Sequence, residues 1–382
     1  MASRFDGTAV IPSARRKRGR QHTRGERYNV RPFLSLFMRI LWITPGFAAD
    51  EADTACIPPL QLLARELLTQ GVDLQIVALE YPFRKGAYYW SGVQVFPSDG
   101  RNRRWLKGRT LWRAWRRCRQ IIHESEVTAI HSFWLGWSSV IGEKLSRQYR
   151  IPHFTTLMGQ DVLPGNGLFL RRLSGERSNR LVALSAFQNE IFEQNAGFGA
   201  GHVIPWGIPA REIQTGMSSA RPIDVLGVGS LVAVKNWDMW LETIAAVHTS
   251  MPGLRAMLIG DGPEKSRLMR YAGRMGLEST VEWAGGLSRE EVLLRMRQAR
   301  VLLHTARFES YGFVLAEAAA NGCRIVSTPV GIAADPGGTA SEAPRLAELL
   351  INALGRPVQN EPAQPYSVNE TASAYLHLYA GR

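Results

Sequence analysis

Apolar and polar positions repeat along the chain in an order that predicts strands alternating with helices. The first buried strand is expected at residues 39–44, and a helix follows from Pro58, where leucine and alanine recur at helical spacing. Proline suits the first turn of that helix, and Gly71 suits its end. Ser185 is a candidate N-cap for a helix over 186–195. Further strands of this run are predicted at residues 72–79, 128–131, 153–156 and 181–184.

A second run of the same kind begins after the polar segment at residues 214–222. Its strands are predicted at residues 224–228, 255–259, 281–284, 301–305 and 324–328. Its helices are expected at 238–250, up to Gly276, after a capping box at 288–291, and around 314–321. Strands that alternate with helices at this interval imply parallel sheets with helices on both faces.

Two such runs in 382 residues predict an α/β protein with two Rossmann-like, doubly wound domains that face each other across a cleft. The first domain is expected at residues 38–210 and the second at 211–366. Residues 367–382 have helical character, and we expect them to fold back on the first domain. The carboxyl ends of the strands would face the cleft, where open α/β sheets bind their ligands.

The composition indicates the class of protein and its cellular compartment. With 45% hydrophobic and 21% charged residues, the chain is typical of a soluble globular protein, and no apolar run approaches the roughly 20 residues of a membrane span. Cys56, Cys118 and Cys323 lie far apart, which argues against a disulfide framework or a structural zinc site. We therefore expect a cytoplasmic protein. A peripheral location on the inner face of the cell membrane is compatible with this expectation.

The net charge of +13 gathers in two segments, and the first is residues 1–37. This segment carries nine Lys and Arg against Asp6 and Glu26, and it has no apolar periodicity, so we expect it to be disordered. It also lacks the apolar region and cleavage site of a secretory signal. Two interpretations stay open: a mis-assigned extension ahead of a native start at Met38, or a basic tail that contacts anionic partners.

The second basic segment, residues 101–119, carries nine Lys and Arg and no acid. Apolar residues recur at helical spacing in its second half, which favours a helix packed on a sheet with a solvated basic back. The alternative is a surface that docks on an anionic membrane, with Trp105, Trp112 and Trp115 at the interface. A nucleic-acid partner is disfavoured because no recognition module accompanies the charge.

The richest candidate chemistry lies in residues 307–335, where a loop follows a buried strand and leads into a helix. Backbone N–H groups converge at such a helix start with partial positive charge, which suits a diphosphate. Gly312 removes a side chain where a ligand would approach the backbone. Glu309 and Glu317 would share one rim and accept hydrogen bonds from sugar hydroxyls. On spacing alone, a loop acid and a solvated helix acid explain the pair equally well.

The order of residues in this stretch resembles the E-x7-E motif of glycosyltransferase family 4, a family of retaining enzymes with the two-domain GT-B fold. The residues that carry the resemblance are 307–313, 317–318, 321–323 and 327–331. By this resemblance Glu309 contacts the transferred sugar and Glu317 the ribose hydroxyls. The backbone amides of residues 311–314 would contact the sugar and the phosphates.

Other stretches agree with the same family in the right order. Residues 227–236 resemble the diphosphate-binding loop, with Lys235 as the cation that neutralises phosphate. Residues 260–263 and 283–285 resemble the base-side elements. The acceptor-side pattern of the first domain is matched by residues 131–134, 151–156, 159–161, 183–185 and 203–208. The resemblance extends over about residues 38–335.

The chain departs from the family pattern at three places. Ser230 stands where members often have Arg, so Lys235 would carry more of the phosphate charge, with Arg307 as a helper. Met158 stands where many have a His that approaches the donor sugar, which puts donor specificity or catalytic efficiency in doubt. A glycine pair after the first strand is replaced by residues 47–57, whose acids at 50–53 would face either a sugar acceptor or solvent.

The resemblance assigns Glu309, Lys235 and Asp161 as catalytic residues. It assigns the following residues to the sugar donor: Gly46, Ser230, Lys235, Arg307, Glu309, Tyr311, Gly312, Phe313, Val314 and Glu317. The sequence shows no Asp-x-Asp pair and no ligand cluster, so we expect a metal-independent reaction with the nucleotide sugar as co-substrate and no cofactor. No confident nucleophile is present, and front-face attack within an ion pair is the working hypothesis.

The expected function is transfer of a sugar from a nucleotide-diphosphate sugar to a glycan or lipid-linked acceptor, in cell-surface polysaccharide synthesis. A nicotinamide-dependent dehydrogenase is disfavoured, because Val232 occupies the third glycine position of the dinucleotide fingerprint. Two alternatives stay open. One is a sugar-nucleotide epimerase or phosphorylase on the same fold, and the other is a non-catalytic, membrane-associated scaffold.

Overall fold

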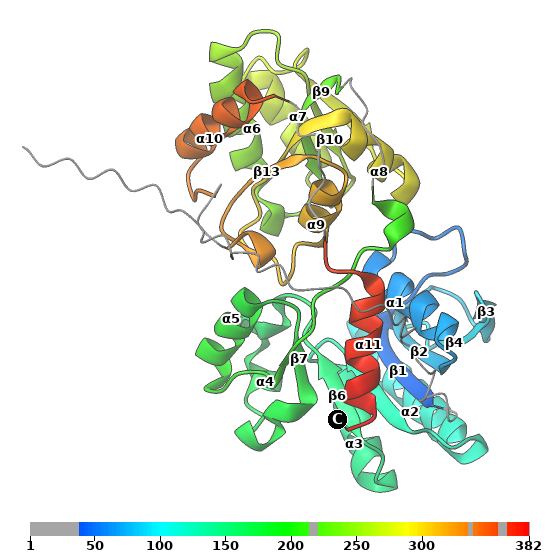
Figure 1. Ribbon diagram of the computed structural model, residues 1–382. Helices are drawn as coiled ribbons and strands as arrows, with labels where there is room; N and C mark the ends of the chain where they lie inside the picture. The colour runs from blue at the N-terminus through cyan, green and yellow to red at the C-terminus, as the bar shows by residue number, and fades with distance from the viewer. Residues whose placement is uncertain (1–37, 214–220, 335–338, 358–364, 382) are drawn as a thin grey trace, which may run out of the picture. The chain divides into compact units, whose positions relative to one another are not determined.

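Two sheets contain the strands of the described residues, which are 38–213, 221–334, 339–357 and 365–381 in this computed structural model (Figure 1). These residues cluster as a single unit. The basic segment 1–37, most of the polar segment 214–222 and Asp335 lie outside the described residues. The expectations for those segments stay predictions.

The first sheet has eight strands in the order β3-β4-β2-β1-β5-β6-β7-β8. Its strands are β1 (Arg39–Gly46), β2 (Asp73–Tyr81), β3 (Tyr88–Trp90), β4 (Val93–Pro97), β5 (Ala129–Phe133), β6 (His153–Thr156), β7 (Leu181–Ala183) and β8 (His202–Val203). All neighbours are parallel except β3 and β4, which form an antiparallel hairpin at the edge. The apolar pattern predicted five of these strands and missed β3, β4 and β8.

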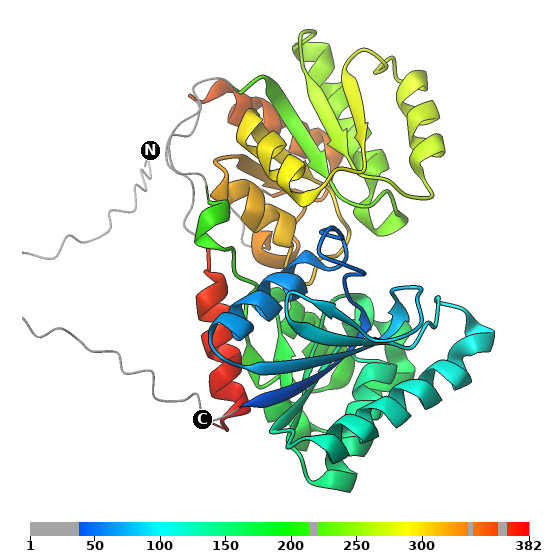
Figure 2. The same cartoon turned by 90° about the vertical axis from the view of Figure 1, so that its right-hand side faces the viewer.

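Helices cover both faces of the first sheet, which explains why residues 40–43 of its central strand β1 are all apolar (Figure 2). Ile40 and Trp42 of β1 belong to one buried cluster, and the intervening Leu41 and Ile43 belong to another on the opposite face. The helices of this half are α1 (Pro58–Thr69), α2 (Lys107–Glu124), α3 (Trp137–Tyr149), α4 (Gly167–Leu170) and α5 (Ala186–Ala196). Ser185 caps α5 as predicted, with its hydroxyl accepting from the Gln188 N–H.

The second sheet has five parallel strands in the order β11-β10-β9-β12-β13. Its strands are β9 (Ile223–Val228), β10 (Ala256–Ile259), β11 (Val281–Gly285), β12 (Ala299–His304) and β13 (Arg324–Ser327). Its helices are α6 (Trp237–Ser250), α7 (Lys265–Arg274), α8 (Arg289–Gln298), α9 (Phe313–Ala320) and α10 (Ala343–Gly355). All five strands were predicted, and the capping box at the start of α8 is present. Helix α10 was not predicted.

The last helix, α11 (Val368–Tyr379), follows the second half in sequence but packs on the first sheet (Figures 1 and 2). The ring of His131 in β5 lies 2.5 Å from the Tyr379 hydroxyl and 2.8 Å from that of Thr156. Thr156 in turn lies 2.9 Å from the Tyr375 hydroxyl. These buried polar groups satisfy one another, so the network fixes α11 in one register on β5 and β6.

Strand order reverses at β9 in the second sheet, since β10 lies on one side of it and β12 on the other. In open parallel sheets such a reversal leaves a crevice at the carboxyl ends of the strands. Loops after β9 and β12 therefore have room for a ligand, and they carry Lys235 and Glu309.

Candidate active site

An open pocket of about 400 Å³ lies at the carboxyl ends of β9 and β10. Its floor includes Gly229 and Gly260, both at positive φ, and a Cβ on Gly260 would come within 1.9 Å of the Gly229 carbonyl oxygen. Only glycine fits there, and the absence of side chains keeps the floor open. The loop before α1 supplies Thr54 and Ala55 to the same pocket, and the first residue of α1 supplies Pro58. Segments attached to both sheets therefore enclose it.

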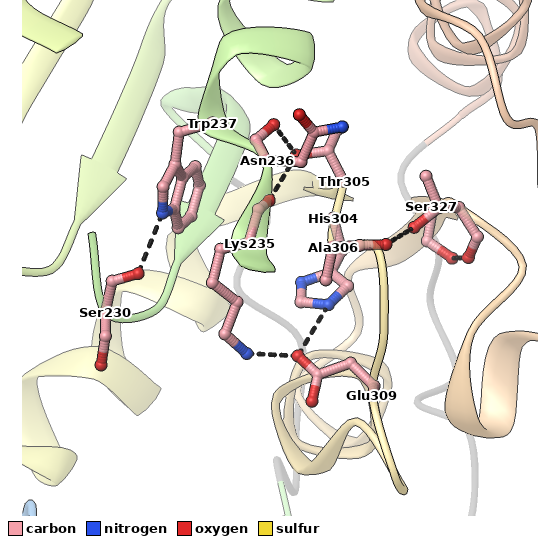
Figure 3. A network of polar contacts seen from close by, with 10 residues as sticks. Ser230, Lys235, Asn236, Trp237, His304, Thr305, Ala306, Glu309 and Ser327 are labelled. Carbon is pink, nitrogen blue, oxygen red and sulfur yellow. Dashed lines mark hydrogen bonds and ion pairs between the residues drawn. The ribbon is translucent and has the colours of Figure 1, made fainter. Parts of the chain in front are cut away.

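Glu309 is the centre of a charged network on one wall of this pocket (Figure 3). Its Oε1 pairs with Lys235 Nζ and lies 3.1 Å from His304 Nε2 at the end of β12. Lys235 lies in a short 3-10 turn, Ala233–Lys235, in the connection after β9, and His304 is the last residue of β12. Thr305 fastens the two segments by donating its hydroxyl to the Lys235 and Asn236 carbonyls at 3.2 and 3.1 Å.

The network keeps Glu309 ionised. Burial alone would raise the pKa of this carboxyl, but the hydrogen bond from His304 and the charge of Lys235 outweigh burial and lower the pKa to about 2. Burial also lowers the pKa of His304, so at neutral pH its ring is uncharged and Nε2–H donates to the carboxylate. The pocket thus holds a negative charge whose position is fixed from two sides.

Glu317 lies on the same pocket and belongs to a second charged group. Its carboxylate pairs with Arg289 at the start of α8, and Arg289 also pairs with Glu212 at 2.5 Å. Burial raises the pKa of Glu317 to about 7, although the charge of Arg289 opposes the rise. The Arg289 N–H donates to Thr54 Oγ1 at 3.3 Å, so this group links the second sheet to the loop before α1.

The loop between Glu309 and α9 is anchored to the first half of the chain. The Ser310 hydroxyl donates to the Met158 carbonyl at 2.8 Å, and the Ser185 hydroxyl donates to the Ser310 carbonyl at 2.5 Å. Gly312, at φ 81°, is the N-cap of α9, where a positive φ suits glycine. The first N–H groups of α9, at Phe313 and Val314, border the pocket, and a helix leaves such groups free to bind an anion.

The predicted site residues divide into two groups. Six of them line the pocket: Ser230, Lys235, Glu309, Phe313, Val314 and Glu317. Tyr311 and Gly312 lie beside it in the chain, and the ring of Tyr311 is buried in the apolar cluster of the first sheet. Arg307 is exposed and donates to the Asn236 side chain at 3.2 Å. Gly46 packs near Tyr81 and Cys56 and is not among the lining residues.

Asp161 lies apart from the pocket and fixes a backbone loop. Its buried carboxylate accepts N–H groups of Leu135, Met158 and Gly159 at 2.8, 3.2 and 2.7 Å. Burial raises its pKa to about 6 against the effect of these hydrogen bonds. In this structure Asp161 positions the Met158 loop, and its catalytic role stays a prediction. The Met158 side chain is buried in the same apolar cluster as Tyr311.

The acids of the loop after β1 accept hydrogen bonds from the loop itself and from residues outside it, at Tyr81 and Ser91. Asp53 accepts from the Tyr81 hydroxyl at 2.7 Å and from the Ala49 N–H at 3.0 Å, and Asp50 accepts from the Ala52 N–H at 2.9 Å. These contacts give the acids a structural role, which neither interpretation included, and the choice between a sugar acceptor and solvent stays open.

Three residues of the site were missed by the sequence analysis: His304, Arg289 and Glu212. His304 ends a run of apolar residues that predicts a buried strand. Arg289 lies inside a predicted capping box, which indicates a helix start and no charge partner. A basic residue directly after a predicted N-cap could have been marked as a candidate for charge pairing, but nothing local identifies its partners.

The described residues bring no group of three or more His, Cys, Asp or Glu together as metal ligands. Metal independence stays a prediction. None of the helices in the described ranges has the length and apolar character that a membrane crossing needs.

Comparisons with known proteins agree with this arrangement. Residues 60–212 match the family model Glycosyltransferase Family 4, and residues 212–336 match the model Glycosyl transferases group 1. The phosphatidylinositol N-acetylglucosaminyltransferase gpi3 subunit of Schizosaccharomyces pombe is 29% identical over 131 residues, 34% of this chain and 29% of that protein. A human protein of the same enzyme name is 25% identical over 292 residues, 70% of this chain and 58% of that protein. The chain thus spans less than two thirds of the length of these relatives.

Among solved structures, Anabaena HepE in complex with UDP and glucose superposes with a TM-score of 0.68 at 19% identity, covering 90% of this chain and all of that one (100%). Sucrose-phosphate synthase from Thermosynechococcus elongatus superposes with a TM-score of 0.67 at 16% identity, covering 90% of this chain and 97% of that one. These likenesses show the GT-B fold, as predicted. The two family models match adjoining segments that together cover residues 60–336, and the fold agrees with them. The chain therefore belongs to the group 1 glycosyltransferases of glycosyltransferase family 4.

Proposed function

We propose that this protein transfers a sugar, with retention of anomeric configuration, from a nucleoside-diphosphate sugar to a glycan or lipid-linked acceptor. The proposal rests on Glu309. Its carboxylate is ionised, contacts Lys235 and His304, and lines a pocket that the first residues of α9 also line. A diphosphate at the α9 N-terminus would place the attached sugar against this carboxylate. The proposal includes no metal and no cofactor besides the nucleotide sugar.

Departure of the diphosphate is the step that the pocket assists. Negative charge grows on the leaving group, and the Lys235 ammonium with the N–H groups of Phe313 and Val314 would stabilise it electrostatically. Lys235 pairs with Glu309 in the present state, so binding of a diphosphate would give the lysine a second anionic partner. Glu309 would then face the positive charge that develops on the sugar. Front-face attack by the acceptor needs no covalent enzyme intermediate, and trapping a glycosyl ester on any carboxylate would refute it.

The experiment that tests the function is donor hydrolysis and thermal shift across UDP, GDP and ADP and their sugars. HepE was crystallised with UDP and glucose, which makes UDP-glucose the first probe. We expect one nucleotide to raise the melting temperature and its sugar conjugate to be hydrolysed slowly without acceptor. A protein that responds to none of them would be the non-catalytic scaffold. Conversion of the sugar without release of nucleotide would indicate an epimerase.

A lipid-linked acceptor is favoured by the exposed surface of α2. Thr110, Ala114, Cys118 and Ile121 face the sheet, as the packed-helix interpretation expects. The opposite face is basic, and Trp105 and Trp112 next to it are 75% and 58% exposed. Lys85, Arg113, Arg116 and Arg117 line a hollow with no acid among its lining residues. We propose that this face holds the protein on an anionic membrane, on the cytoplasmic side, during cell-surface polysaccharide synthesis.

Reversing the charge of this face should abolish binding to anionic liposomes. The variant Arg113→Glu/Arg116→Glu/Arg117→Glu replaces three attractive charges, each contributing about 1 kcal/mol near such a surface, by repulsive ones. Co-sedimentation with phosphatidylglycerol vesicles measures the effect. The control Arg270→Glu/Arg274→Glu reverses two charges on the exposed face of α7 and should bind nearly as well as the wild type. Equal loss in both variants would mean that net charge alone governs binding.

Replacing His304 by Leu should move the acid limb of the pH–rate profile upward. The imidazole hydrogen bond is one of the effects that lower the pKa of Glu309 to about 2, and a hydrogen bond to a charged group contributes about 1.5–3 kcal/mol. Without it the pKa should rise by about one unit or more, so protonation would remove activity at a higher pH. The exposed His377→Leu serves as control. An unchanged acid limb would show that His304 does not act on Glu309.

A further inference from the structure

A second pocket, of about 110 Å³, lies at the amino ends of β6 and β7, on the first sheet alone. His153 and Leu181, the first residues of those two strands, line it, and α3 and α4 form its sides. It shares no lining residue with the pocket around Glu309. Whatever it binds is therefore not the nucleotide sugar of the proposed reaction.

Four arginines line this second pocket against a single acid: Arg147, Arg172, Arg177, Arg180 and the acid Glu143. Arg147 and Arg177 both lie 2.6 Å from the same Glu143 oxygen. Neither Arg172 nor Arg180 has a carboxylate within ion-pair distance among the described residues. The pocket consequently carries an excess of three positive charges.

The floor of the pocket is rigid and polar. His153 is 8% exposed, and its Nε2 lies 2.9 Å from the Ser132 hydroxyl. Gly142 brings α3 onto β6, since a Cβ there would come within 2.3 Å of His153 Nε2. Burial, followed by the charges of Arg180 and Arg177, lowers the pKa of His153 to about 3. The ring therefore stays neutral, mainly because it is buried, and the charges of the two arginines act in the same direction.

The positive surface continues beyond the pocket. Ser146, Arg147 and Arg180 also border an adjoining hollow, which adds Arg150 and His202. A ligand with one anionic group in the inner pocket could therefore extend a second group along this surface. The arrangement suits a multiply charged oxyanion better than a single carboxylate.

We propose that this arginine pocket binds a phosphate-bearing ligand at a site separate from the sugar-nucleotide pocket. Guanidinium groups offer planar pairs of N–H donors that match two phosphate oxygens at once. Arg172 and Arg180 supply these pairs, and Ser146 at the pocket wall supplies a hydroxyl. A phosphate dianion would offset most of the excess charge. Two sources share this chemistry: a soluble phosphate compound and the headgroup of a phosphate-bearing lipid.

The variant Arg172→Gln/Arg180→Gln tests the proposal, because neither arginine holds an ion pair in the described part of the fold. Calorimetric titration of the full-length protein with inorganic pyrophosphate should show at least a ten-fold loss of affinity in this variant. The control Arg270→Gln/Arg274→Gln removes the same charge from α7 and should titrate like the wild type. Pyrophosphate that enters the Glu309 pocket contributes equally to all three proteins. Identical titration curves, together with unchanged binding to phosphatidic acid vesicles, would therefore overturn the proposal.

A second arm distinguishes the two sources. Vesicles of phosphatidylcholine with phosphatidic acid are compared with free pyrophosphate as ligand, each with wild type and variant. Loss of pyrophosphate binding alone assigns a soluble ligand, and loss of vesicle binding alone assigns the headgroup. If the variant binds both probes as the wild type does, the pocket is not an anion site. UDP binding, which tests the proposed function, should be the same in all variants.

Discussion

Glu309→Gln is expected to lower the rate of sugar transfer by about a thousand-fold, the scale seen when one preorganised electrostatic contact is removed. Glutamine keeps the volume of the side chain and an oxygen that can accept from His304, so the wall of the pocket should hold its shape. What is lost is the negative charge that faces the reacting sugar. Nucleotide affinity should change little, because the proposed diphosphate contacts lie at Lys235 and α9.

Initial rates with the responsive sugar donor, together with calorimetry using its nucleoside diphosphate, measure both effects. The control Glu282→Gln lies on the exposed side of β11 and should leave rate and affinity unchanged. Loss of nucleotide affinity in Glu309→Gln, with the rate at saturation preserved, would show that the roles of Glu309 and Glu317 are exchanged. A variant with the full rate would refute the catalytic assignment.

The sequence predicted those parts of the site that lie close together along the chain. Glu309, Glu317 and the start of α9 form one local motif, and Lys235 follows a predicted strand at the right interval. Their convergence on one pocket follows from parallel strands having their carboxyl ends at one edge. The convergence of these residues depends only on the order and direction of the strands, so a correct assignment of the strands is sufficient to predict it.

The partners of these residues could not be predicted, because side-chain pairing is set by packing in three dimensions. Arg289 meets Glu212 and Glu317 across 77 and 28 residues of sequence. His304 is only five residues from Glu309. It follows a run of apolar residues, however, and that pattern indicates a buried strand residue and not a partner for Glu309. Asp161 is a different case. Its carboxylate accepts three backbone N–H groups, a structural role that the motif did not indicate, and its catalytic role stays a prediction.

The strands of the first sheet were predictable at its centre and were missed at its two edges. Strand β1 is buried on both faces over most of its length, which leaves a clear apolar run. The hairpin of β3 and β4 forms one of these edges, and β8, of two residues, forms the other. The antiparallel pairing of the hairpin also lies outside the repeated strand–helix order from which the sheets were inferred.

Arg289→Met is expected to destabilise the fold by about 3–5 kcal/mol, because it leaves two buried carboxylates without their cation. The side chains of Arg289 and Glu212 are each 13% exposed and that of Glu317 is 8% exposed. The control is Arg267→Met, whose pair with Asp238 has exposures of 45% and 36% and should contribute less than about 1 kcal/mol. Urea unfolding at a fixed pH compares the two variants with the wild type.

The pH dependence and a rescue variant identify the cause of this loss. The pKa of Glu317 is already raised to about 7, and removing Arg289 raises it further. A carboxyl whose folded pKa exceeds its unfolded value loses stability as pH rises, so the deficit of Arg289→Met should be larger at pH 8 than at pH 5.5. Adding Glu212→Gln and Glu317→Gln removes the unpaired charges and should restore most of the stability. A deficit no larger than that of Arg267→Met would show that the buried group contributes nothing to stability, and the geometry around Glu317 would then rest on backbone packing alone.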